Sequence, residues 1–223
     1  MARKKLLRFE ENDGFSSVLQ PSPYKLLEGP HPYRGKWSET HFGNLNPLVL
    51  ELGCGRGEYA VGLALASKDK NFIGVDIKGS RLYHGAKFVE ENSLPNICFV
   101  RTRIDYIAQI FDNEINEIWL TFPDPRPERK RKRLTSPIFM ERYLKILKGH
   151  GLLHLKTDSK PLCDYTLEVA QEFGLEVLHH TDDLYSLENR DEICPPIQTA
   201  YEKRYLAEGR KINFLTLKVK NNF

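Results

Sequence analysis

One carboxylate in the chain lies between two prolines and directly before a strongly basic stretch. The segment from Ile118 to Ser136 reads IWLTFPDPRPERKRKRLTS, so an apolar run ends at Phe122 and Asp124 follows within two residues. Because proline lacks a backbone N–H and disfavours helix at the residue before it, we expect Phe122 and Asp124 to be extended and the strand to end there. Open α/β sheets bind ligands at the carboxyl ends of their strands, so Asp124 is a candidate catalytic residue.

Basic residues crowd the stretch that follows Asp124. Glu128 is the one acid within it, and its cations are Arg126, Arg129, Lys130, Arg131, Lys132 and Arg133. Such a run suits the phosphate backbone of RNA, and binding would then weaken steeply with salt. The alternative interpretation is a proline turn followed by a solvated charged face.

A glycine-rich turn forms a second candidate site. Gly53, Gly55 and Gly57 follow the apolar run PLVLEL and precede the helical pattern EYAVGLALAS. Glycines at such a turn let the backbone approach a ligand closely. The third glycine of a dinucleotide-binding fingerprint would fall at residue 58, which is Glu58, so the spacing argues against a pyrophosphate ligand.

Two acids accompany this turn. Glu51 lies inside the first strand, two residues before Gly53. A carboxylate there would repel a pyrophosphate but could balance a cation, and S-adenosylmethionine carries an ammonium and a sulfonium. Asp76 ends the next apolar run, where an acid binds ribose hydroxyls in nucleoside-binding α/β folds. The alternatives are a paired acid near a strand end for Glu51 and a helix N-cap for Asp76.

Apolar runs and helical patterns alternate from Pro47 onward, which is typical of a parallel sheet with helices on both faces. The expected strands are PLVLEL, NFIGVDI, NICFVRT, the run ending at Phe122, GLLHLKTD, LEVLHH and INFLTLKV. The last run alternates apolar and polar residues, which favours an antiparallel strand. We therefore predict a doubly wound, mostly parallel seven-stranded α/β sheet with an antiparallel last strand, in one domain covering residues 47–223.

Residues 1–46 differ from the rest of the chain. They begin with Arg3, Lys4, Lys5 and Arg8 and continue into the Pro/Gly/Tyr-rich run PSPYKLLEGPHPYRGKW. We expect a basic arm and a cover segment, partly disordered at its beginning; an ordinary flexible terminus is the alternative.

Composition narrows the class of protein. The chain has 223 residues, of which 40% are hydrophobic and 28% charged, enough for one ordinary core. The net charge of +3 and pI near 8.6 are weak signals of a polyanionic partner, so local clustering carries that inference. With no apolar run of membrane-spanning length and no signal peptide, we expect a cytoplasmic protein. The four cysteines lack metal-site spacing, so we expect buried thiols and no metal.

Several segments together resemble the bacterial tRNA (guanine-N7)-methyltransferase family. The motifs are ELGCGRGEY, GVDIKGSR, TFPDPRPERKRKRL, LLHLKTDS and TAYEKR, and the similarity covers Trp37 to Val219. The resemblance implies a Rossmann-like, S-adenosylmethionine-dependent enzyme that methylates N7 of a guanine in the variable loop of tRNA. Cofactor contacts would then fall on Glu51, Gly53, Gly55, Asp76, Arg103 and Asp124. Substrate contacts would fall on Asp158, Thr199, Ala200, Tyr201 and Glu202.

Three positions depart from the family pattern. Arg103 stands where the family usually has Asp or Asn, so Asp105 or the backbone could make that contact instead. Arg126 replaces the usual Trp. Glu128 replaces a Lys, so Arg129 or Lys130 could supply the charge that binds substrate.

Guanine N7 has a free lone pair, so methyl transfer needs no general base, and catalysis can rest on positioning. We expect Asp124 to stabilise the positive charge that moves onto the purine, with Asp158 as a second acid at the neighbouring strand end. The pattern of Thr199 and Glu202 is also that of a helix capping box, and Tyr201 could stack on a base.

Other functions remain open at the level of sequence. The same fold class includes nicotinamide-dependent oxidoreductases, although Glu51 and the missing third glycine disfavour one. A non-catalytic RNA-binding protein on a methyltransferase fold is a further alternative, as is a small-molecule methyltransferase, which would not explain the basic run. The chain could act as a monomer or a homodimer.

Overall fold

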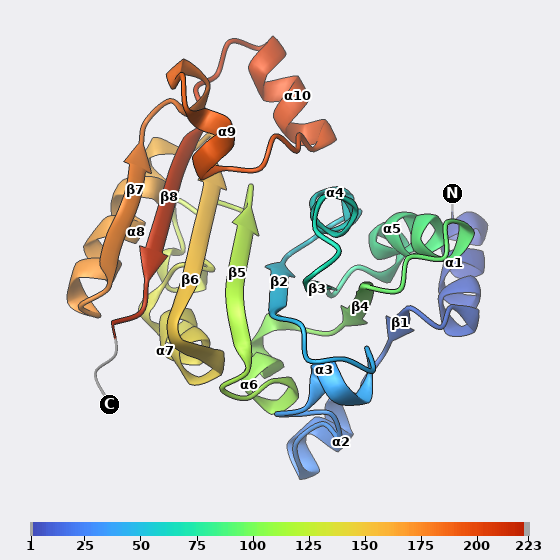
Figure 1. Ribbon diagram of the computed structural model, residues 1–223. Coiled ribbons are helices and arrows are strands. Elements are labelled where there is room, and N and C mark those ends of the chain that lie inside the picture. The colour runs from blue at the N-terminus through green and yellow to red at the C-terminus, as the bar shows by residue number, and fades with distance from the viewer. Residues whose placement is uncertain (1, 221–223) are drawn as a thin grey trace.

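A computed structural model describes residues 2–220, except for the side chains of residues 2–6 and 9, so Arg3, Lys4 and Lys5 of the expected basic arm lie outside the described side chains. The central element is one eight-stranded sheet (Figure 1). Its strands are β1 (Val18–Leu19), β2 (Leu48–Leu52), β3 (Asn71–Asp76), β4 (Ile97–Arg101), β5 (Ile115–Thr121), β6 (Leu147–Thr157), β7 (Glu176–Thr181) and β8 (Asn213–Lys218).

The strand order is β1-β4-β3-β2-β5-β6-β8-β7. All pairings from β1 through β6 are parallel, whereas β8 runs antiparallel to both β6 and β7. The predicted mostly parallel sheet with an antiparallel last strand is confirmed. Since β2 pairs with β3 on one side and β5 on the other, the chain winds outward in both directions from β2. A crevice opens at the carboxyl ends of such strands.

Helices cover both faces of the sheet (Figure 1). The helices are α1 (Ala2–Gly14), α2 (Pro23–Glu28), α3 (Trp37–Thr40), α4 (Glu58–Ala66), α5 (Gly79–Glu91), α6 (Ile107–Ile110), α7 (Pro137–Ile146), α8 (Lys160–Glu172), α9 (Arg190–Ile193) and α10 (Ala200–Ala207). Short 3₁₀ turns lie at Ile104–Tyr106, Lys130–Lys132 and Leu184–Ser186.

Alternation along β2 sorts its side chains between two core layers. Leu48, Leu50 and Leu52 pack with α6, α7 and α8 on one face. Val49 packs with α4 and α5 on the other. Glu51 shares the parity of Val49, so the strand directs this carboxylate toward the first turn of α4.

Residues 2–46 contribute elements to the same fold. β1 pairs with β4 and adds an eighth strand at the sheet edge, where the sequence had indicated seven. This strand has only two residues and therefore no apolar periodicity. Trp37 is completely buried in the main core, and α1, whose start was expected to be disordered, is helical and packs against α5.

The four cysteines are free and buried, as predicted. Within residues 2–220 no helix is long and apolar enough to cross a membrane. The same part of the chain contains no group of three or more His, Cys, Asp and Glu side chains arranged to hold a metal ion.

Candidate active site

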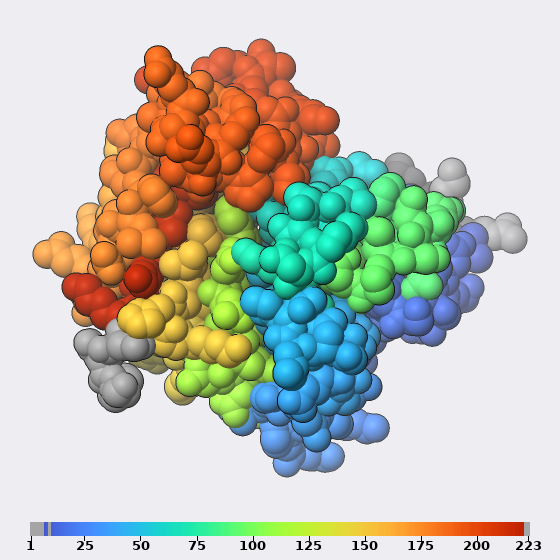
Figure 2. Space-filling model, in the orientation of Figure 1, coloured from blue at the N-terminus to red at the C-terminus, as the bar shows by residue number. Residues whose placement is uncertain are grey.

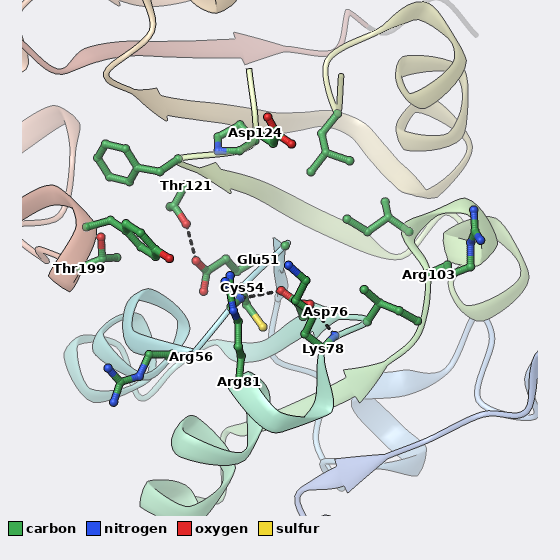
Figure 3. Close-up of a pocket in the computed structure, with 18 of the residues that line it drawn as sticks. Glu51, Cys54, Arg56, Asp76, Lys78, Arg81, Arg103, Thr121, Asp124 and Thr199 are labelled. Atoms are coloured by element: carbon green, nitrogen blue, oxygen red, sulfur yellow. Dashed lines mark hydrogen bonds between the residues drawn. The ribbon is translucent and has the colours of Figure 1, made fainter. Parts of the chain in front are cut away.

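A cleft of about 1170 Å³ opens where β2, β3, β4 and β5 end, and α10 forms one of its walls. Its floor holds the glycine turn with Glu51 and Asp76 (Figure 3). Its rim carries residues of the basic stretch after β5. The predicted site residues that line it are Glu51, Gly53, Gly55, Asp76, Arg103, Asp124, Thr199, Ala200 and Tyr201.

The glycine turn has a backbone conformation that residues other than glycine rarely adopt. Gly53, Gly55 and Gly57 have φ angles of 78°, 56° and 74°. A Cβ on Gly57 would lie 2.6 Å from the buried ring of Phe99, whereas a Cβ on Gly53 or Gly55 would meet no atom beyond its chain neighbours closer than 3.6 Å. The first two glycines therefore leave room for a ligand, and the third allows close packing under the turn.

Asp76 holds this turn in place. One carboxylate oxygen accepts a hydrogen bond from the backbone N–H of Gly55 at 2.9 Å, and the other accepts one from Lys78 N–H at 2.7 Å. The N-cap of α5 is Lys78, so the capping role considered for Asp76 is not the one observed. The carboxylate instead lines the cleft where β3 ends.

Glu51 is a buried carboxylate on the floor of the cleft (Figure 3). It accepts hydrogen bonds from Ala60 N–H at 2.9 Å and from the hydroxyl of Thr121, the last residue of β5. Burial raises the pKa of Glu51 to about 7, against the opposing effect of these two hydrogen bonds; the negative charges of Asp76 and Glu58 raise the pKa further. An acid in such surroundings is stabilised as a carboxylate by a cation in the cleft.

The end of β5 turns more sharply than the sequence suggested. Phe122 has a φ of 48°, in the left-handed region, and its N–H donates to Lys156 O at 2.7 Å, so the prediction of an extended Phe122 is wrong. The proline rule argues against a right-handed helix here, but the bond to β6 selects a left-handed turn. Backbone outliers of this kind cluster at functional sites.

Asp124 stands free of the core at the rim of the cleft. Its side chain is 68% exposed and lies 3.5 Å from the guanidinium of Arg126, and it accepts a hydrogen bond from the backbone N–H of Arg126 at 3.2 Å. The carboxylate can therefore reorient toward a bound ligand without losing any buried contact.

The basic stretch is divided by the fold. Arg126, Arg131 and Lys132 line the cleft, whereas Arg129 does not. Arg133 turns inward: it is buried, donates to Pro125 O at 2.8 Å and lies 4.5 Å from the ring centre of Tyr165. Arg133 is therefore not part of the cationic surface that the sequence predicts for RNA binding.

Arg103 lines the cleft with its guanidinium paired to Asp105, 3.2 Å away, and 63% of its side chain exposed. Figure 3 shows it at the far side of the cleft from Thr199. The segment after β4 also brings Thr102, Ile104 and Asp105 to the cleft. The substitutes considered for an acid at residue 103 are therefore present.

The first turn of α10 combines capping with a position in the cleft wall. The Thr199 hydroxyl accepts from Glu202 N–H at 3.2 Å, so the predicted cap is formed. Ala200 N–H donates to Glu58 Oε2 at 2.7 Å, which ties α10 to α4. Tyr201 is 46% exposed and available to a ligand in the cleft.

Comparison with known proteins identifies the family. The model for a family of putative methyltransferases matches residues 45–215. The tRNA (guanine-N(7)-)-methyltransferase of Christiangramia forsetii is 46% identical over 222 residues, or 98% of this chain and 99% of the relative. That of Bacteroides fragilis is 44% identical over 96% of this chain and 85% of the relative. The chain belongs to the tRNA (guanine-N7)-methyltransferase family.

Solved methyltransferases share the fold. The 16S rRNA methyltransferase KamB has a TM-score of 0.64 at 13% identity, over 85% of this chain and 95% of KamB. A 16S rRNA (adenine(1408)-N(1))-methyltransferase from Catenulisporales acidiphilia, solved with the cosubstrate SAM, has a TM-score of 0.56 at 12% identity, over 91% of this chain and 93% of that one. These structures agree in fold with the family match, which makes the chain a methyltransferase and leaves the oxidoreductase alternative without support.

Within this methyltransferase, some predicted substrate contacts lie outside the cleft. Glu202 is completely buried, so direct contact with a substrate does not fit its position. Its carboxylate lies 2.7 Å from Lys156 Nζ and accepts from the Tyr185 hydroxyl at 2.8 Å. Asp158 does not line the cleft and pairs with Arg210 at 2.8 Å. Like Arg129, these acids belong to the surroundings of the site.

Sequence reasoning missed Lys156 and Thr121. Lys156 is 1% exposed and is the buried cation that holds Glu202. A lysine inside the apolar strand GLLHLKTD was the available signal, because buried lysines are almost always paired. Thr121 gave no such signal, since threonine is common in strands.

Proposed function

We propose that this methyltransferase transfers the methyl group of S-adenosylmethionine to N7 of a guanine in the variable loop of tRNA. Glu51 is the observation that carries the proposal. It is a carboxylate with a pKa of about 7 on the floor of a large cleft, beside a turn whose three glycines have positive φ. Such a site gains most from a ligand that brings positive charge and no phosphate.

The residues of the cleft fit this cofactor. S-adenosylmethionine supplies a methyl group activated by a positively charged sulfur. Glu51 would balance that charge, and Gly53 and Gly55 would leave room for the ligand. Asp76 would accept from ribose hydroxyls in addition to its bonds to the turn. The segment around Arg103 and the carboxylate of Asp124 complete the predicted cofactor surroundings.

The protein's own contribution to catalysis would be position and charge. Guanine N7 carries a lone pair and no proton, so no residue has to act as a base. Asp124, exposed at the rim, would accept hydrogen bonds from the N–H edge of the base and stabilise the positive charge that develops on the purine. Tyr201 offers a ring for stacking, and Thr199 and Ala200 shape the wall.

The rim supports an RNA substrate. Arg126, Arg131 and Lys132 reach the cleft from the basic stretch, and Arg142 joins them from α7. A cleft this deep with a cationic rim suits a base extruded from a strand whose phosphates lie outside. With tRNA as substrate, the protein would act in the cytoplasm.

The deciding experiment is methyl transfer from labelled S-adenosylmethionine to unmodified tRNA transcripts, followed by digestion and identification of the nucleoside. We expect 7-methylguanosine, and we expect it to disappear when the variable-loop guanine is replaced by adenine. Labelled tRNA that contains a different methylated nucleoside would overturn the proposal. Binding of tRNA with no methyl transfer and no affinity for the cofactor would favour the non-catalytic RNA-binding alternative.

A further inference from the structure

A second, smaller groove adjoins the cleft on the side of the N-terminal helix. It has a volume of about 280 Å³ and lies where α1, the glycine turn and α5 meet. The space-filling view shows the surfaces of α1 (blue) and α5 (green) in contact along one edge of the molecule (Figure 2). The residues that line both the groove and the cleft are Gly55, Arg56, Arg81 and Tyr201. The two spaces therefore adjoin.

The lining of the groove is cationic. Arg8 comes from α1, Arg56 from the glycine turn and Arg81 from α5, and Ser80, His84 and Tyr201 complete the described lining together with Gly55. That lining contains no carboxylate. Three guanidinium groups from three different elements thus surround one small space.

These guanidinium groups are poorly neutralised. Arg56 has Glu58 at 3.8 Å, near the limit of an ion pair, with half of its side chain exposed. Within residues 2–220, Arg8 and Arg81 have no carboxylate within ion-pair distance; Arg8 lies over the ring of Tyr83 at 5.5 Å. Guanidinium groups held without anionic partners are suited to bind phosphate.

The pKa of His84 reflects the positive charge of the neighbouring guanidinium groups. Burial lowers its pKa, and the positive charges of Arg56 and Arg8 lower it further, while Glu58 acts in the opposite direction. The net effect is a site that disfavours a further cation. An anion in the groove would offset these positive charges, and the pKa of His84 would rise.

We propose that this groove binds a backbone phosphate of the RNA strand, next to the nucleotide whose base enters the cleft. The inference rests on the proposed function. Tyr201 forms the wall common to both spaces, so a strand that places its base in the cleft passes the groove with an adjoining phosphate. Arg56 and Arg81 face that phosphate from the cleft side, and Arg8 closes the groove from α1. The N-terminal helix is thereby part of the RNA site.

The test is the salt dependence of tRNA binding by R8A, with K148A as the matched control. Lys148 is an exposed cation near the start of β6, at the amino ends of the parallel strands and away from the cleft. We expect R8A to reduce the slope of log K against log salt by about one and to raise the KM for tRNA about three- to tenfold, with unchanged affinity for S-adenosylmethionine. K148A should leave the slope and KM unchanged.

A second variant separates the groove from the packing of α1. R81A removes a guanidinium that comes from α5 rather than from α1, and it should reduce the slope as R8A does. R8K should restore the slope. NMR titration of His84 provides an independent readout. Its pKa should rise on binding a guanosine-containing trinucleotide, and should rise less with an analogue whose linkages are neutral methylphosphonates.

If R8A and R81A show the same slope of log K against log salt as K148A, the proposal that the groove binds a phosphate is overturned. The proposed function is tested separately. Normal formation of 7-methylguanosine with unaltered slopes would support the proposed activity and contradict phosphate binding in the groove. Altered slopes without methyl transfer would support phosphate binding in the groove and contradict the proposed activity.

Discussion

Lys156 Nζ and the Glu202 carboxylate lie 2.7 Å apart, with 1% and 0% of their side chains exposed. The lysine comes from β6 and the glutamate from α10, so this ion pair fastens the cleft wall to the sheet. Lys156 also donates to Ile197 O at 3.1 Å and lies 5.3 Å from the ring centre of Tyr59. The Thr199–Glu202 motif thus has an outward half that faces the cleft and an inward half that anchors it.

Removing one partner of this pair should be far worse than removing both. E202L leaves the Lys156 charge buried without a carboxylate, and we expect the free energy of unfolding to fall by about 3–5 kcal/mol. The double variant K156M/E202L replaces the pair by apolar groups and should lose less than the sum of the single changes. Urea unfolding of the four proteins in the cycle measures the coupling. Additive losses would show that the pair is not a unit.

Glu51 should make stability depend on pH. Its pKa is about 7 in the folded protein against 4.5 as the usual value, so the folded state binds more protons between these pH values. This contribution is fully present below pH 4.5 and is lost as pH rises through 7, by about 3 kcal/mol. We therefore expect E51Q to gain about that much relative to wild type between pH 4.5 and 8, measured by urea unfolding. Parallel pH profiles of the two proteins would contradict the shift.

Much of the fold could be predicted because its signals are local. The strands that build the cleft are apolar runs that end at glycines, an acid or a proline, and the helix patterns between them require parallel pairing. Glu51, Asp76 and Asp124 could be found in the same way, since each ends or interrupts an apolar run. β1 could not, because a strand of two residues has no periodicity and forms only by pairing with β4.

The inward orientation of Glu202 depends on a residue that is distant in the sequence. Thr199 caps the helix as the local pattern indicates, but Glu202 is turned inward by a lysine 46 positions earlier in the chain (Lys156). The left-handed Phe122 likewise depends on a hydrogen bond to β6. In both cases a tertiary partner chooses between conformations that the local sequence permits.

Two glycines with positive φ should respond differently to alanine. Gly57 has a φ of 74° and its Cβ would meet Phe99 at 2.6 Å, whereas Gly174 has a φ of 64° and open space around it. G174A should cost about 1–2 kcal/mol for the left-handed backbone alone. G57A adds an overpacking cost of about 1–3 kcal/mol and disturbs the glycine turn, so affinity for S-adenosylmethionine should fall as well. Equal thermal stability of the two variants would argue against close packing under the turn.

Replacing Asp124 by asparagine tests the assigned catalytic charge. The side chain is exposed, so D124N should fold with unchanged stability. If the carboxylate stabilises charge on the purine, single-turnover methyl transfer should slow about 100- to 1000-fold, because the amide is nearly isosteric but neutral. D164N, which changes an exposed, ion-paired acid on α8, is the matched control and should retain the wild-type rate. Wild-type turnover by folded D124N would remove Asp124 from the mechanism and leave in-line positioning by the cleft as the source of catalysis.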